Sequence, residues 1–258
     1  MPNPTKKSLV IANWKMKLSL GESVALAKAI TLLANKYDKE VKLVVCPSFP
    51  VLYPLSQIFK GKKVSLGAQD VFWKAIGSYT GEVSPSMLKE LGVEYVLVGH
   101  SERRQYLKET DQIVHHKTLS ALSDGLIPIV CVGETFTERQ QGNKDLVVAR
   151  QVEKALAGVE LKSTDQLIVA YEPVWVIGSG QAVEVDEAEH SSQVIKQSLI
   201  NLFPANTVSK QMSIIYGGSV DASNINDFIP SEIIAGVLVG SASLTINTFS
   251  ALVKTLTS

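Results

Sequence analysis

A lysine, a histidine and a glutamate each stand at the end of a separate apolar run of the chain. Lys15 follows the run SLVIAN, His100 closes YVLVGH and Glu172 closes LIVAYE. A carboxylate is costly to bury unless it is paired, and Pro173 makes the chain turn directly after Glu172. Alone, each residue fits a structural explanation, such as a solvated loop lysine or a hydrogen-bonded histidine. Together they are the cation, imidazole and carboxylate that general acid–base chemistry uses.

Two glycine-containing segments, YGGS (216–219) and VGS (239–241), end the last two apolar runs. Backbone N–H groups in such turns bind phosphate groups at the strand ends of a barrel. The segment GSGQAV (178–183) is a weaker signal, because it lacks the spacing of a P-loop and matches only part of a dinucleotide motif. The two terminal segments therefore predict a small phosphorylated substrate.

Eight short apolar runs recur along the chain. Most are nearly continuous in apolar residues, which is typical of strands buried on both faces of a parallel sheet. The runs are SLVIAN (8–13), VKLVVC (41–46), VSLGAQ (64–69), YVLVGH (95–100), IPIVCVG (127–133), LIVAYE (167–172), SIIYGG (213–218) and AGVLVG (235–240).

Amphipathic helical patterns separate these runs. Ser19-x-x-Glu22 has the spacing of a capping box, and Ser84-Pro85 opens a helix that Gly92 closes. The segments 111–125 and 186–204 are bounded in the same way. Runs and helical patterns thus alternate as β–α units.

Eight β–α units in about 250 residues predict an α/β fold, a single (β/α)8 barrel over residues 1–258. The alternative is an open doubly wound sheet, which more often carries G-x-G-x-x-G after its first strand; this chain reads ANWKMKLS there. No low-complexity linker divides the chain. In a barrel the carboxyl ends of all strands meet at one rim, which would bring Asn13, Lys15, His100 and Glu172 to one cavity.

The composition limits the classes of partner. Of the 258 residues 45% are hydrophobic, which is ample for a core, and 25 basic residues balance 25 acidic ones. This balance supplies no electrostatic attraction to nucleic acid or to an anionic membrane. The first residues lack the apolar core of a signal peptide and no later run reaches the length of a membrane span, so a cytoplasmic protein is expected.

The remaining cysteines and histidines have structural interpretations. Cys46 and Cys131 each lie in a strand-like run, where a thiol behaves as a small buried hydrophobe, so no disulfide is expected. His115 and His116 are adjacent in a helical segment and point in different directions, and no carboxylate pattern completes a metal site near them. We interpret these two and His190 as surface or packing residues, and expect neither a metal nor a cofactor.

The motifs NWK (13–15), GHSERR (99–104) and YEPVW (171–175), in that order, resemble the triosephosphate isomerase family. The likeness continues through GAQD, SYTGEVS, CVGE, YGGSV and LVGSASL, so that it spans nearly the full length. It implies a TIM barrel that interconverts dihydroxyacetone phosphate and D-glyceraldehyde 3-phosphate through an enediolate, in glycolysis and gluconeogenesis. It also implies a homodimer.

The resemblance implies a role for each matching catalytic residue. Glu172 would be the base and His100 an electrophile. Lys15 would be an electrophile and a substrate anchor, with Asn13 beside it.

The resemblance also implies binding, lid and interface residues. Phosphate would be held by Asn13 and Lys15 and by the N–H groups of Gly178, Ser219, Gly240 and Ser241. Residues 173–183 would form a mobile lid that includes Pro173, Trp175, Gly178 and Gly180. In the homodimer, Thr80 of the third loop would lie against the neighbour's catalytic residues.

Six positions depart from the usual pattern of the family. Val176 replaces a common alanine, and Gln181-Ala182-Val183 stands where Lys-Thr-Ala is frequent. Ala235 stands where an aspartate is common, and Ser241 where a second glycine is common. If position 241 needs a positive φ, serine there would be strained by about 1 kcal/mol.

Two questions stay open at this stage. The third loop, AQDVFWKAIGSYTGE, is rich in apolar residues, so that it either contacts a partner or folds onto its own barrel. The alternative enzyme is another phosphate-binding barrel, such as a Schiff-base aldolase, which would need Lys15 in a desolvated pocket. A non-catalytic barrel would be expected to lack Lys15, His100 or Glu172.

Overall fold

The computed structural model describes residues 7–162, 166–177, 182–229 and 231–257. Within these ranges eight parallel strands close into a barrel in sequence order, and the last strand pairs with the first. The strands are β1 (Ser8–Asn13), β2 (Val41–Cys46), β3 (Val64–Ala68), β4 (Tyr95–Val98), β5 (Ile127–Val132), β6 (Leu167–Tyr171), β7 (Met212–Tyr216) and β8 (Ile234–Val239). The predicted (β/α)8 barrel is confirmed, because an open sheet would leave two edge strands unpaired.

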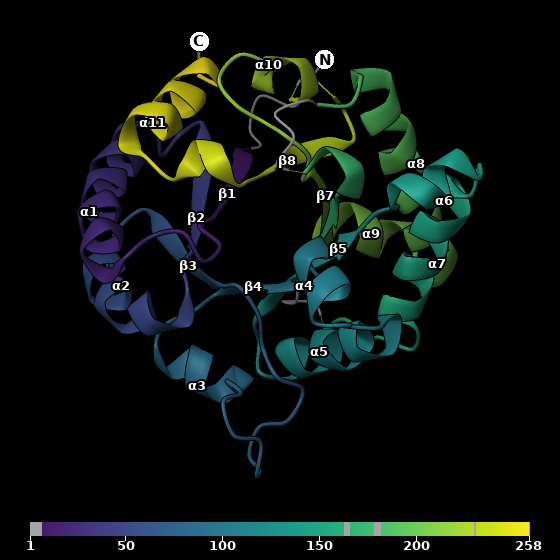
Figure 1. Cartoon of the computed structure of the whole chain (residues 1–258), viewed down its shortest axis with the longest axis horizontal. Coiled ribbons are helices and arrows are strands. Elements are labelled where there is room, and N and C mark those ends of the chain that lie inside the picture. The colour runs from purple at the N-terminus through teal and green to yellow at the C-terminus, as the bar shows by residue number, and fades with distance from the viewer. Residues whose placement is uncertain (1–6, 163–165, 178–181, 230, 258) are drawn as a thin grey trace.

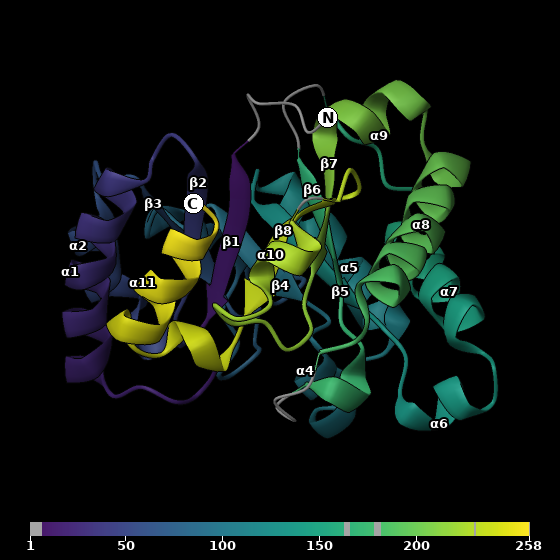
Figure 2. The same cartoon turned by 90° about the horizontal axis from the view of Figure 1, so that it is seen from above.

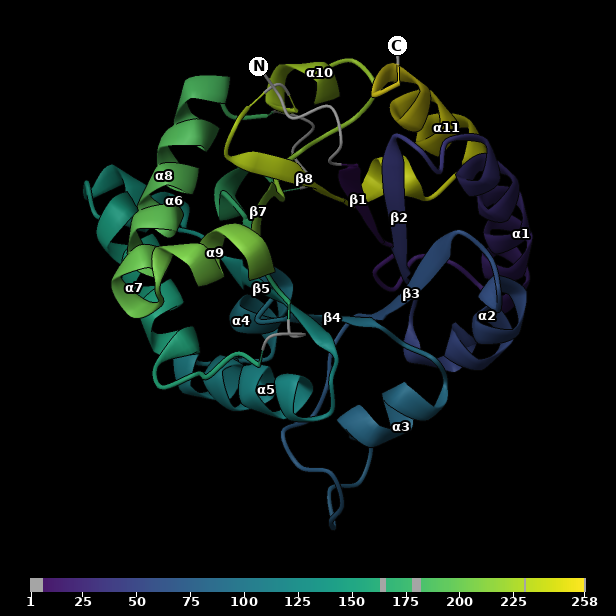
Figure 3. The same cartoon turned by 180° about the vertical axis from the view of Figure 1, so that it is seen from behind.

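Helices surround the ring of strands on the outside, as Figure 1 and, from behind, Figure 3 show. They are α1 (Leu20–Lys36), α2 (Leu52–Phe59), α3 (Pro85–Glu90), α4 (Ser101–Tyr106), α5 (Asp111–Ser123), α6 (Phe136–Gln140), α7 (Lys144–Leu156), α8 (Val185–Leu202), α9 (Ala205–Gln211), α10 (Ile225–Phe228) and α11 (Ile246–Thr255). Short 3-10 turns cover Phe49–Val51, Val174–Val176 and Ser241–Ser243. No helix in the described ranges is both long enough and apolar enough to cross a membrane.

The helix starts predicted at Ser19 and Ser84 are confirmed, whereas the helix predicted over 186–204 begins at Val185 without a side-chain cap. The Ser19 side chain accepts from the Glu22 N–H, and the Glu22 carboxylate accepts from the Ser19 N–H, which completes the capping box of α1. Ser84 caps α3 in the same position, and Pro85 is its first residue.

The strands are buried on both faces, which explains their continuous apolar sequences. Along β1, Leu9 and Ile11 point into the barrel and pack with residues such as Ile129 and Ile168. Val10 and Ala12 point outward into the layer between the strands and the helices. Both layers exclude water, so neither face of a strand needs polar residues.

The carboxyl ends of the strands lie on one side of the barrel. In the view of Figure 2, α4 and α6, which follow β4 and β5, lie below the strands, whereas α9, which precedes β7, lies above. The residues that follow each strand therefore share one rim, as a barrel requires.

The third loop, residues 69–84, leaves this rim and projects from the body of the protein (Figure 1). Its base folds onto its own barrel, since Val71 and Phe72 are buried. Its tip does not, because the Ile76 side chain is 93% exposed and Tyr79 is 44% exposed. The structure thus divides the apolar residues of this loop between its own core and a free tip.

A buried cluster of charges holds the base of this loop to α4 and α5. Lys117 Nζ lies 2.6 Å from Asp70 Oδ1 and also pairs with Glu109. Arg103 bridges the same two acids, with Nη2 2.8 Å from Asp70 Oδ2 and Nε 2.6 Å from Glu109 Oε1.

Burial raises the pKa of Asp70 to about 6, and the Lys117 charge limits the rise. This pKa is higher than that of an aspartate in the unfolded chain, so ionised Asp70 lowers the free energy of unfolding above about pH 6. The loss becomes smaller as the pH falls, because Asp70 takes up a proton.

We expect Lys117→Met to lower the free energy of unfolding by about 3–5 kcal/mol near neutral pH, because it leaves two buried carboxylates with Arg103 as their remaining cation. The loss should shrink at about pH 5, where unpaired carboxylates can take up protons. Chemical denaturation at both pH values measures this. The exposed Lys28→Met is the control, with a change within about 0.5 kcal/mol. An equal loss at both pH values would contradict the electrostatic account.

Candidate active site

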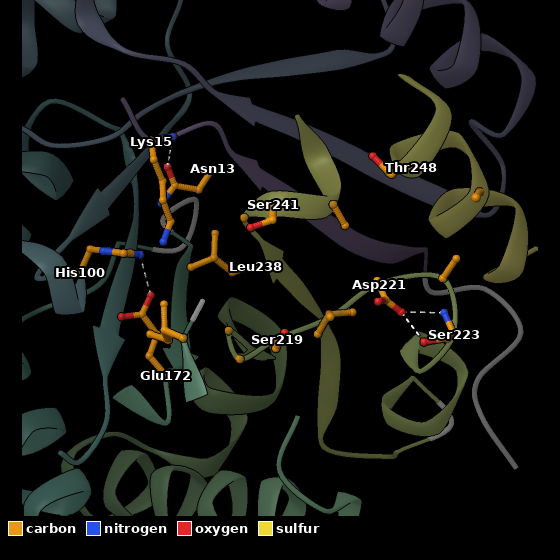
Figure 4. A pocket seen from close by; sticks show the side chains of 18 residues that line it. Asn13, Lys15, His100, Glu172, Ser219, Asp221, Ser223, Leu238, Ser241 and Thr248 are labelled. Atoms are coloured by element: carbon orange, nitrogen blue, oxygen red, sulfur yellow. Dashed lines mark hydrogen bonds and ion pairs between the residues drawn. The ribbon is translucent and has the colours of Figure 1, made fainter. Parts of the chain in front are cut away.

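A cavity of about 620 Å³ opens at the carboxyl ends of the strands. Its lining brings together the described residues that the sequence predicted for catalysis and phosphate binding: Asn13, Lys15, His100, Glu172, Ser219, Gly240 and Ser241. Figure 4 shows Lys15, His100 and Glu172 on one side of the cavity, and Ser219 and Ser241 beside them. One cavity thus holds a base candidate, two candidate electrophiles and a candidate phosphate site.

Glu172 follows β6, and its carboxylate is 2% exposed. Its backbone N–H donates to Val132 O at 2.7 Å, and Gly133 packs so closely that an added Cβ would lie 1.7 Å from Glu172 O. The Oε2 atom accepts a hydrogen bond from the Ser101 N–H at 2.9 Å. The Oε1 atom is buried and has no hydrogen bond within the described residues. One oxygen is therefore anchored, and the other is free to accept a proton.

His100 lies opposite that free oxygen, with Nε2 3.2 Å from Glu172 Oε1 (Figure 4). It is the N-cap of α4, and its Nδ1 accepts the Glu102 N–H at 3.2 Å. A nitrogen that accepts a hydrogen bond carries no proton, so the ring proton is assigned to Nε2. The start of α4 thus presents a neutral imidazole N–H to the cavity.

Lys15 has a backbone conformation that few residues with a side chain adopt, with φ of 51°. Two hydrogen bonds hold this conformation: the Lys15 N–H donates to Asn13 Oδ1 at 3.0 Å, and Gln69 Nε2 donates to Lys15 O at 2.9 Å. Gly240 lies against the side chain, since a Cβ there would be 3.4 Å from Lys15 Cε. Such a conformation persists only where surrounding structure enforces it, as is common at functional sites.

The ion-pair partner of Lys15 is Glu102, which sequence reasoning did not identify. Lys15 Nζ lies 2.6 Å from Glu102 Oε1, whereas the sequence suggested Asn13 and Glu172 as its polar neighbours. Glu102 belongs to the motif GHSERR, so its position after β4 was the available signal. Gln69, which also donates to Cys46 O, was missed as well.

The two glycine-containing turns lie where the sequence predicted. Ser219 follows β7, and Gly240 and Ser241 follow β8, all facing the cavity. The strain considered for Ser241 does not arise, because Lys15 and Lys108 are the non-glycine residues with positive φ in the described ranges. Ala235, the other departure near this strand, lies in β8, away from this cavity.

The predicted lid is described at its two ends. Pro173 and Trp175 lie at the first end, where Trp175 Nε1 donates to Glu134 Oε1 at 2.9 Å. At the second end the Val183 N–H donates to the Tyr216 hydroxyl at 3.3 Å. Burial raises the pKa of Tyr216 to about 12, so the hydroxyl is neutral at physiological pH. Gly178 and Gly180, with Ser179 and Gln181, lie outside the described residues.

Other sequence candidates lie elsewhere. His115 Nδ1 donates to Ala155 O at 3.1 Å, His116 lies near Trp73 with the two rings tilted, and His190 pairs with Asp145, so all three are packing or surface residues as predicted. Cys46 and Cys131 are free and buried, and burial raises the pKa of both thiols, so neither is a thiolate nucleophile.

Thr80, the predicted interface residue, is exposed in the third loop. The described residues contain no group of three or more His, Cys, Asp and Glu side chains placed to hold a metal ion.

Comparisons with known proteins agree with this geometry. The model of the family described as triosephosphate isomerase matches residues 8–256. Relatives named triosephosphate isomerase include those of Dictyoglomus thermophilum, 40% identical over 96% of this chain and 99% of the relative, and Carboxydothermus hydrogenoformans, 42% identical over 96% and 98%. The relative from Clostridium tetani is 41% identical over 96% of both chains. The chain therefore belongs to the triosephosphate isomerase family.

Proposed function

We propose that this protein interconverts dihydroxyacetone phosphate and D-glyceraldehyde 3-phosphate. The observation that carries the proposal is the Glu172 carboxylate, which has one anchored oxygen and one buried oxygen without a hydrogen bond, 3.2 Å from His100 Nε2. The family and the names of the relatives support the same activity.

The reaction moves a proton between two adjacent carbons. Glu172 Oε1 removes the proton from one carbon, and the electron pair of the C–H bond forms the enediolate C=C bond as the carbonyl oxygen becomes an oxyanion. The same carboxyl group returns the proton to the neighbouring carbon, and a proton shift between the two oxygens completes the exchange. Burial of the base removes competing water, which strengthens its interaction with the substrate.

The developing oxyanion needs a partner in the site. His100 donates its Nε2–H to it, and the Lys15 ammonium supplies a fixed positive charge, with Asn13 holding the Lys15 backbone. The N–H groups of Gly178, Ser219, Gly240 and Ser241 hold the phosphate, together with Asn13 and Lys15. Residues 173–183, including Pro173, Trp175 and Gly180, close over the substrate and protect the intermediate.

The ion pair of Lys15 disfavours the aldolase alternative. A Schiff base requires an unprotonated amine, whereas Lys15 Nζ forms a 2.6 Å contact with the Glu102 carboxylate. Borohydride treatment in the presence of substrate should therefore trap no covalent adduct.

We expect Glu172→Gln to lower kcat by about 10³-fold, because the amide keeps the shape of the side chain but cannot accept the carbon-bound proton. A coupled assay with glyceraldehyde 3-phosphate measures kcat, and inhibition by a phosphate-bearing substrate analogue should stay close to that of the intact protein. Glu153→Gln, which changes an exposed acid, is the control. Turnover near that of the intact protein would remove Glu172 from the role of base.

Lys15→Ala should reduce kcat/KM by at least about 10²-fold, with a higher KM and a lower kcat, because the ammonium binds the substrate in the ground state and interacts more strongly with the oxyanion of the transition state. The matched control is Lys17→Ala, two residues further on and exposed. Equal kinetics for both variants would refute the assignment of Lys15.

We also propose that residues 1–258 form one catalytic domain, that the protein is a cytoplasmic homodimer, and that Thr80 reaches the neighbour's active site. The projecting third loop supports the dimer, because its tip exposes Ile76 and Tyr79.

Ile76→Asp should shift the protein from dimer to monomer and lower activity, since a charge at the contact is costly to desolvate. Sedimentation velocity at micromolar concentration measures the change. Leu32→Asp, at a leucine that is 73% exposed on α1, should leave the dimer intact. A fully active monomer of the intact protein would overturn the proposed dimer.

A further inference from the structure

Ser241 presents a hydroxyl group to the cavity at the carboxyl ends of the strands. It is the first residue after Gly240, in the short turn Ser241–Ser243 that follows β8. The Ser241 side chain is exposed to the cavity, which Lys15, Gly218 and Ser219 also line. Figure 4 shows its oxygen turned toward the part of the cavity that holds Lys15 and Leu238.

The turn that carries Ser241 is well fixed. The Ser243 N–H donates to Gly240 O at 2.9 Å, and the buried Ser243 hydroxyl contacts the same oxygen at 2.7 Å and Val239 O at 3.2 Å. Because position 241 does not have a positive φ, the serine needs no strained backbone to hold its Cβ there. The backbone that carries the hydroxyl is therefore held in place before any ligand binds.

The hydroxyls of Ser241 and Ser219 have no hydrogen-bond partner within the described residues, whereas the hydroxyls of Ser243, Ser223 and Thr248 are already engaged. Ser243 donates to the backbone, Ser223 donates to Asp221 Oδ1 at 2.5 Å, and Thr248 Oγ1 contacts Thr245 O at 3.2 Å. A free hydroxyl in a cavity that a lysine also lines is suited to donate to an anionic oxygen.

We propose that the Ser241 hydroxyl donates a hydrogen bond to a phosphate oxygen of the substrate, in addition to the backbone N–H groups of this site. The inference rests on the proposed function, since it assigns a ligand of the same phosphate. It makes Ser241 a binding residue that determines specificity for phosphorylated trioses over unphosphorylated ones. This hydrogen bond contributes the same free energy in the ground state and in the transition state, because the phosphate does not react.

The test compares Ser241→Ala and Ser241→Gly with the intact protein. Loss of one hydrogen bond to a charged group should raise KM for glyceraldehyde 3-phosphate by about 10-fold and leave kcat nearly unchanged. Thr248→Val, at the far end of the cavity, is the control and should keep both constants (Figure 4). An unchanged KM in both Ser241 variants would overturn the inference.

A second substrate separates a phosphate contact from a structural role. D-Glyceraldehyde lacks the phosphate, so the Ser241 variants should isomerise it at the rate of the intact protein. An equal loss on both substrates would mean that the substitutions disturb the site, and would overturn the inference.

Direct binding of inorganic phosphate, measured by calorimetry, keeps the inference separate from the proposed function. If the intact protein shows no isomerase activity, the proposed function fails. A roughly 10-fold weaker binding of phosphate by Ser241→Ala would still support the hydroxyl contact. Equal binding by both proteins would overturn it.

Discussion

The buried carboxylate of Glu172 is the interaction on which the rest of the site depends. An acid that is 2% exposed is stable only where its surroundings replace water. Here the Ser101 N–H donates to one of its oxygens, and His100 Nε2 lies 3.2 Å from the other. The other oxygen lacks a hydrogen bond in the described part of the chain. The protein thus keeps a base that is incompletely solvated, which is what makes it effective at removing a proton from carbon.

The barrel makes this arrangement possible because it joins rigid backbones at one rim. Ser101 and His100 come from the start of α4, and Glu172 from the end of β6, where Gly133 leaves room for its backbone. Lys15 holds a left-handed conformation through hydrogen bonds to Asn13 and Gln69. These contacts orient the charged groups before substrate arrives, so little reorganisation remains for the reaction itself.

A second group of buried charged side chains lies at the base of the third loop, where it stabilises the fold. In the cluster at the base of the third loop, Asp70 and Glu109 share Lys117 and Arg103, so that each acid lies beside two cations. This pairing stabilises the fold and fixes the base of the third loop, whose tip is exposed. The two sites thus differ in that the buried acids at the base of the loop lie beside lysine and arginine, whereas Glu172 lies beside a histidine.

Much of the fold and the site followed from the amino-acid sequence alone. Continuous apolar runs predicted strands buried on both faces, capping residues marked helix starts such as Ser19 and Ser84, and motif order placed Lys15, His100 and Glu172 on one rim. These features depend on local periodicity and on chain order, which a sequence carries directly.

Tertiary structure alone decided the distances and partners. It paired Lys15 with Glu102, 87 residues away, left one oxygen of Glu172 without a hydrogen bond, and gave Ser241 an unstrained backbone with a free hydroxyl. It also divided the third loop between a buried base and a free tip. Such features arise from contacts between segments far apart in the chain, and neither residue type nor spacing specifies which polar atoms finally meet.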